Sequence, residues 1–123
     1  MLFRSVKCNA VESLKSAENT KALLIYSEDD PICSMLHYNT LRSAFEGVER
    51  VKLLLVNGKG HNPNYTADAA AYVSEFGKAR AKLARNKKAT AEDKASFVAS
   101  YDWRRMTKQD EDVWQKIFEH LDN

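Results

Sequence analysis

Residues 22–63 read ALLIYSEDDPICSMLHYNTLRSAFEGVERVKLLLVNGKGHNP. Two short and mostly apolar runs, residues 22–27 and 51–56, stand near the two ends of this segment. Such runs are typical of strands that are buried on both faces of a parallel sheet. Between them, residues 34–45 carry apolar side chains at three- and four-residue spacing, which predicts a helix. The segment is therefore predicted to be a βαβ unit with parallel strands.

Outside residues 22–63, the sequence predicts mainly helices. We expect them at residues 10–15, from Thr66 to about residue 85, from Thr90 onward, and from Thr107 onward. The expected N-cap residues of the helices are Asn9, Ser34 and Thr66, because their side chains can accept hydrogen bonds from free helical amides. The fold class is thus α/β, with C-terminal helices after the βαβ unit. A two-stranded sheet is marginal alone, so we expect self-association to complete the sheet.

Length, charge and cysteine content narrow the function classes. A chain of 123 residues is one domain by length. Its net charge of +2 favours neither nucleic acid nor an anionic membrane as a partner. No apolar run approaches the roughly 20 residues of a membrane span, and the first residues lack the pattern of a secretory signal. With only Cys8 and Cys33 present, we expect reduced thiols and a cytoplasmic location.

Two ionisable side chains follow the two predicted strands. Asp30 stands just after the first strand, and His61 just after the second, next to Gly60. Adjacent parallel strands lie about 4.8 Å apart, so the two side chains are predicted to lie within hydrogen-bonding distance. A carboxylate that orients an imidazole makes that imidazole a general base. The alternatives are a solvated acidic turn for Asp30 and an ordinary surface loop for His61.

The segments LLIYSEDDPI (residues 23–32) and VNGKGHNP (residues 56–63) together resemble the C-terminal part of an α/β-hydrolase. The resemblance covers about residues 5–80 and implies a catalytic acid at Asp30 and a catalytic base at His61. Ser27 stands where the family commonly has Gly, and Cys33 where it commonly has Val. The tail, residues 101–123, resembles more weakly an extension of some bacterial members.

The same resemblance implies a partial α/β-hydrolase fold, the C-terminal half of the family's domain. Residues 1–123 would then form a single domain with three parts. These parts are a lead-in segment at 1–21, a βαβ-α core at 22–86 and a helical extension at 87–123.

The nucleophile of that family is missing from the sequence. No serine stands in a Gly-x-Ser-x-Gly pattern. Cys33 follows Asp30 on the same turn, so we expect it to lie away from His61, and Cys8 lies in a segment without a clear pattern. These two cysteines, with His37 and His120, show no metal-ligand spacing. The sequence therefore predicts neither a metal site nor a cofactor.

Three functional hypotheses remain open. The chain is a partial hydrolase that retains Asp30 and His61 and is inactive alone. Alternatively, it is half of a split serine hydrolase that a nucleophile-bearing chain completes. The third hypothesis is a non-catalytic module that forms a homodimer through its sheet edge or through swapped elements. The sequence does not distinguish ester, peptide and lactone substrates.

Overall fold

Two parallel strands and six helices make up the part of the chain that the structure, a computed structural model, describes, which is residues 9–123. Cys8 and the start of the lead-in segment lie outside these residues. In chain order the elements are α1 (Ala10–Ser16), β1 (Ala22–Ser27), α2 (Met35–Ala44), β2 (Val51–Val56), α3 (Ala67–Arg85), α4 (Ala91–Ala99), α5 (Trp103–Met106) and α6 (Glu111–Asp122). This arrangement confirms the predicted mixed α/β class, with a βαβ-like unit followed by helices.

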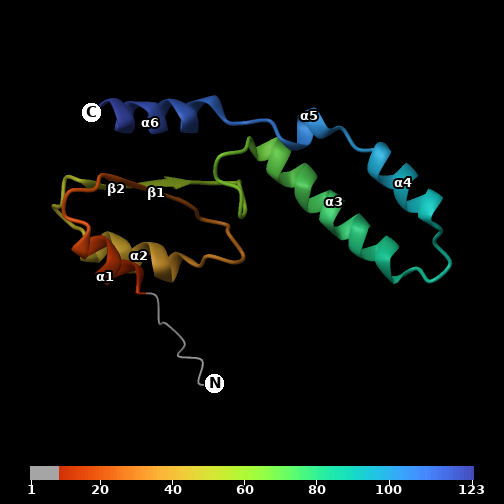
Figure 1. Cartoon of the computed structure of the whole chain (residues 1–123), viewed down its shortest axis with the longest axis horizontal. Helices are drawn as coiled ribbons and strands as arrows, with labels where there is room; N and C mark the ends of the chain where they lie inside the picture. Colours follow the sequence, from red (N-terminus) through yellow and green to blue (C-terminus); the bar gives the residue numbers. More distant parts are fainter. Residues whose placement is uncertain (1–8) are drawn as a thin grey trace, which may run out of the picture.

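The two strands pair in parallel with no offset. Ala22 lies opposite Val51, and the register continues to Ser27 opposite Val56. The amide of Glu28 donates to the carbonyl of Val56 at 2.9 Å, so the pairing extends one residue past β1. Both strands therefore end at the same edge of the sheet. Figure 1 shows this edge facing the loop that leads to α3.

The hydrophobic core lies on one face of the sheet. Leu41 and Phe45 of α2 and its C-cap pack there with Val51 of β2. Apolar side chains from α1 and both strands surround them, namely Val11, Leu14, Ala22, Leu24, Tyr26, Ala44, Val48 and Leu53. Figure 1 shows α1 and α2 together on this side of the strands. Alternate strand residues thus bury one set of side chains, as a pleated strand requires.

Helix α6 lies on the opposite side of the sheet (Figure 1). A cavity of about 360 Å³ separates it from β1 and is lined by Leu23, Ile25, Ile117, Leu121, Lys21 and His120. On α6 itself, Phe118 and the cavity-lining Leu121 remain 56% and 69% exposed. The second face of the sheet is therefore covered only loosely within residues 9–123.

Helices α3, α4 and α5 form an arm that extends away from the sheet (Figure 1). Its aromatic side chains pack on one another, with the Phe76 ring 5.4 Å from Phe97 and 4.8 Å from Tyr101. Trp103 also packs against Phe76, with the two ring centroids 5.8 Å apart. None of the helices in the described range has the length and apolar composition needed to cross a membrane.

Two predictions about helix ends need correction. Ser34 occupies the N-cap position of α2, but its side chain makes no capping hydrogen bond. The last helix begins at Glu111 and not at Thr107, because Asp110 is its N-cap and accepts from the amide of Val113. Thr107 is instead the C-cap of α5, and Gln109 pairs with Tyr65 in an antiparallel bridge.

The N-cap of α3 allows a direct test of local stability. Thr66 Oγ1 accepts from the amide of Ala69 at 3.1 Å, as predicted. We expect Thr66→Ala to lower the free energy of unfolding by about 1 kcal/mol, because one helical amide loses its partner. Thr40→Ala is the matched control, since the Thr40 hydroxyl only bonds a carbonyl within α2. Urea unfolding measures both, and equal losses in the two variants would contradict the capping role.

Candidate functional site

The acidic turn after β1 holds Asp30 in place through its own backbone. Asp30 Oδ1 accepts from the amide of Ile32 at 2.7 Å and from the amide of Cys33 at 3.0 Å. Pro31 has no N–H, so the carboxylate takes up the next two amides of the turn. This leaves Oδ2 free to contact the loop after β2.

The loop after β2 presents His61 to that carboxylate. Gly58 and Gly60 have φ values of +71° and +56°, which L-residues with side chains rarely adopt. The chain therefore reverses sharply just past the end of β2. As a result, His61 stands beside the turn that follows β1.

Asp30 and His61 form a direct contact. His61 Nδ1 lies 2.9 Å from Asp30 Oδ2, and this confirms the predicted proximity of the two side chains. The Asp30 side chain is 7% exposed, whereas that of His61 is 51% exposed. The carboxylate is thus enclosed, and the other ring nitrogen, Nε2, has no hydrogen-bonding partner within residues 9–123. One ring nitrogen is held while the other remains available.

A second carboxylate fixes the same loop. Asp29 Oδ1 accepts from the hydroxyl of Ser27 at 2.6 Å and from the amide of Gly60 at 3.3 Å. Ser27 is itself only 1% exposed, and its hydrogen bond is the main cause of the lowered pKa of Asp29. Sequence analysis missed this link, although Ser27 at the end of β1 was visible as a departure from the hydrolase pattern. Asp29 therefore couples the acidic turn to the residue that precedes His61.

The environment of Asp30 keeps its carboxylate ionised. Partial burial by itself raises the pKa of this carboxyl, but the amides of Cys33 and Ile32 and the ring of His61 lower it further than burial raises it. The net pKa lies below the ordinary value for Asp. At neutral pH the side chain is thus a negative hydrogen-bond acceptor for the imidazole. This is the state in which a carboxylate orients a histidine.

The expectation that Cys33 lies away from His61 is wrong. Asp30, Cys33 and His61 each offer one metal-ligating atom, and these atoms all lie within 4.8 Å of one another. The turn after β1 folds back on itself through the amide of Cys33, which brings the thiol toward the histidine loop. The half-buried Cys33 is therefore a member of the site.

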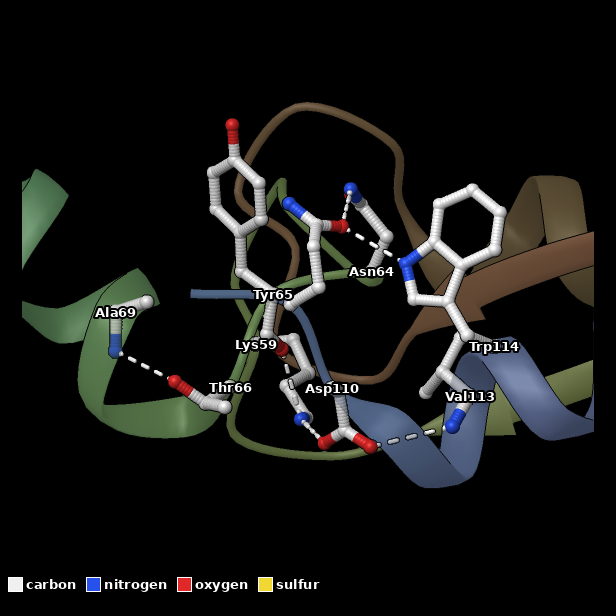
Figure 2. A network of polar contacts seen from close by, with 9 residues as sticks. Lys59, Asn64, Tyr65, Thr66, Ala69, Asp110, Val113 and Trp114 are labelled. Carbon is white, nitrogen blue, oxygen red and sulfur yellow. Dashed lines mark hydrogen bonds and ion pairs between the residues drawn. The ribbon is translucent and has the colours of Figure 1, made fainter. Parts of the chain in front are cut away.

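A buried lysine ties the histidine loop to the C-terminal segment (Figure 2). Lys59 Nζ donates to the carbonyl of Tyr65 at 2.8 Å and forms an ion pair with Asp110, which caps α6. The Lys59 side chain is 9% exposed. Sequence analysis did not find this pair, because Lys59 and Asp110 are distant in the chain and neither residue stands in a recognisable pattern.

Backbone and amide contacts extend this junction. The amide of Thr66 donates to the carbonyl of Lys108 at 3.0 Å, and that of Asp110 donates to the carbonyl of Asn64 at 2.9 Å. The side-chain oxygen of Gln109 accepts from Asn64 at 2.8 Å and from the indole of Trp114 at 2.9 Å. Figure 2 shows Asn64 and Trp114 converging here from the loop and from α6. The extended segment after α5 is thus fastened to the loop that carries His61.

No family model, curated protein or solved structure matches this chain.

Proposed function

We propose that this chain carries the acid and base of a serine-hydrolase-type site, with Asp30 as the acid and His61 as the base. The observation that supports the proposal is the 2.9 Å contact between Asp30 Oδ2 and His61 Nδ1 at the ends of adjacent parallel strands. It agrees with the resemblance of both segments to the C-terminal part of an α/β-hydrolase. On this proposal the chain is a partial α/β-hydrolase fold.

Each residue has a defined task in this proposal. Asp30 fixes the tautomer of His61, with the proton on Nδ1, and stabilises the imidazolium that forms during reaction. The free Nε2 of His61 then takes the proton from a hydroxyl nucleophile and returns it to the leaving group. That nucleophile comes from outside residues 1–123, because the sequence has no Gly-x-Ser-x-Gly elbow. The 123-residue chain alone is therefore inactive.

The inactivity of the isolated chain is directly testable. We expect no ester hydrolysis by the purified chain that a fluorophosphonate inhibits, because the covalent step has no nucleophile. Incubation with a fluorophosphonate probe, followed by intact mass measurement, should leave the mass of the chain unchanged. Stoichiometric labelling at a serine would show that the chain holds its own nucleophile and would overturn this part of the proposal.

The acid–base role requires a complementing chain. A tagged copy is expected to co-purify with a nucleophile-bearing chain that reacts with the same probe. His61→Ala should slow that reaction at least about 10³-fold, whereas His37→Ala on the exposed side of α2 should leave it unchanged. Labelling of the partner at equal rates with both variants would contradict a catalytic role for His61.

A second candidate function, homodimer formation, rests on the free edge of β1. Within residues 9–123 the sheet has only two strands, so each has one unpaired edge. β1 carries no charged side chain, whereas β2 carries Lys52, and charged side chains are a common protection of exposed edges. We infer that the β1 edges of two copies pair across a two-fold axis and form one larger sheet.

Sedimentation tests this association. We expect the purified chain to sediment as a dimer at micromolar concentration. A clean monomer at that concentration would overturn the homodimer, while the acid–base proposal would still stand. The exposed apolar residues Ile32 and Leu36 give such an assembly further surface to bury.

A further inference from the structure

Three different kinds of metal ligand meet at the end of the sheet. Asp30 offers a carboxylate oxygen, Cys33 a sulfur and His61 a ring nitrogen, all within 4.8 Å of one another. They come from two loops, the acidic turn after β1 and the glycine-flanked loop after β2. Spacing along the sequence does not indicate this set of three ligands, because His61 follows a different strand from Asp30 and Cys33.

We propose that Asp30, Cys33 and His61 bind one zinc ion, with the fourth coordination position open to water. Sulfur, imidazole nitrogen and carboxylate oxygen are the three donor types that zinc takes in proteins. Magnesium and calcium prefer all-oxygen sites, so a thiolate and an imidazole select against them. Three protein ligands with one open position form the arrangement of a reactive zinc site, whereas structural zinc sites close all four positions.

The distances allow such an ion with small movements. In a tetrahedral site the nitrogen and oxygen ligands lie about 2.0–2.1 Å from zinc and hence about 3.3 Å from each other. His61 Nδ1 and Asp30 Oδ2 are 2.9 Å apart, so they must separate by a few tenths of an ångström. A sulfur at about 2.3 Å from the ion lies about 3.6 Å from the nitrogen. The Cys33 sulfur already lies within 4.8 Å of the nitrogen, so it must approach by about 1.2 Å at most.

The loops already hold the ligands in place. Asp30 Oδ1 is occupied by the amides of Ile32 and Cys33, so only Oδ2 faces the proposed ion. The amide of Gly60 is tied to Asp29, which fixes the residue next to His61. Such supporting hydrogen bonds orient the ligands of known metal sites. Because His61 is 51% exposed, water and the ion can reach the site.

The proton balance follows from the ligand set. Zinc replaces the proton between Nδ1 and Oδ2, and His61 stays neutral by carrying its proton on the free Nε2. The Cys33 thiol loses its proton and binds as a thiolate. One proton is therefore released per zinc ion. Zinc binding and the acid–base role exclude each other, because both use Nδ1 of His61, and either one can hold if the other fails.

Cobalt(II) substitution provides the first test. The full chain, freed of metal with a chelator, is titrated with Co²⁺ and then with Zn²⁺ in competition. We expect a thiolate-to-cobalt charge-transfer band that saturates at one equivalent and that zinc abolishes. Cys8→Ser should keep the band, and so should His37→Ala. Cys33→Ser and His61→Ala should each weaken binding at least about 100-fold, more than the loss of a supporting residue does.

A second measurement uses the unmodified chain and so does not depend on the folding of the variants. Zinc should shift the ¹⁵N resonance of His61 Nδ1, move the ring proton from Nδ1 to Nε2, and release the Cys33 thiol proton into weakly buffered solution. The absence of a saturable band, its survival in Cys33→Ser, its loss in Cys8→Ser, or an unchanged Nδ1 resonance would each overturn the site.

Discussion

Replacing Phe45 with Ala is expected to lower the free energy of unfolding by about 3 kcal/mol. Phe45 is 4% exposed and packs with Leu41 and Val51 at the centre of the core. The substitution removes the only ring among the three buried residues of this cluster, which are Leu41, Phe45 and Val51. A domain of this size is typically stable by only about 5–15 kcal/mol. Urea unfolding should therefore show a strongly lowered midpoint.

Phe118 is the matched control for Phe45, since the same substitution there removes a ring that is 56% exposed. We expect Phe118→Ala to cost well under 1 kcal/mol in the isolated chain, as exposed positions do. If Phe45→Ala cost no more than Phe118→Ala, the core would not lie where α2 meets the sheet. A large and concentration-dependent loss for Phe118→Ala would instead show that a second copy covers α6.

Most of the helices and strands were predictable from residues that are close together in the sequence. The apolar runs of β1 and β2 are short and unbroken, and buried parallel strands need such runs. Asn9, Thr66 and Thr90 each stand before a helix and accept from its first amides, as their side chains predict. The approach of Asp30 and His61 was predictable for a related reason. Parallel strands that are joined by one helix end at the same edge of a sheet.

Features that depend on distant contacts could not be predicted in this way. Thr107 is a good N-cap residue by type, yet Gln109 pairs with Tyr65 and delays the start of α6. The position of Cys33 depends on the hydrogen bond of its own amide to Asp30, which folds the turn back toward His61. By sequence, Lys59 is an ordinary surface lysine between two glycines. In the structure it forms an ion pair with Asp110 and its side chain is only 9% exposed. None of these contacts can be predicted from the spacing of residues along the sequence.

That buried pair supports the last prediction. Lys59→Met keeps the aliphatic stem but leaves the Asp110 carboxylate and the Tyr65 carbonyl without their donor. Removing one member of a fully buried pair costs about 3–5 kcal/mol. Asp110 is 21% exposed, so water can solvate it in part, and we expect a loss of about 2 kcal/mol. Asp68→Asn, which breaks the exposed pair with Arg105, is the control and should cost less.

The pH dependence of unfolding tests whether the loss of stability in Lys59→Met comes from the Lys59–Asp110 ion pair. The hydrogen bond from Lys59 holds the pKa of Asp110 below its ordinary value, although partial burial opposes this. An Asp in the unfolded chain has a pKa of about 3.9. The stabilisation is therefore complete above that pH and is lost as the pH falls through the lower folded-state pKa. The gap in stability between the native chain and Lys59→Met should accordingly be widest at neutral pH and narrow below about pH 4.

The double variant Lys59→Met with Asp110→Asn separates the charge from the cap, because Asn caps a helix as well as Asp does. It should recover part of the stability that Lys59→Met loses, since no carboxylate is then left without its partner. Amide exchange at Gly60 and His61 reports the structural consequence, because Lys59 joins their loop to the start of α6 (Figure 2). Unchanged exchange in Lys59→Met would mean that the contacts of Asp29, Asp30 and Asn64 hold the histidine loop without Lys59.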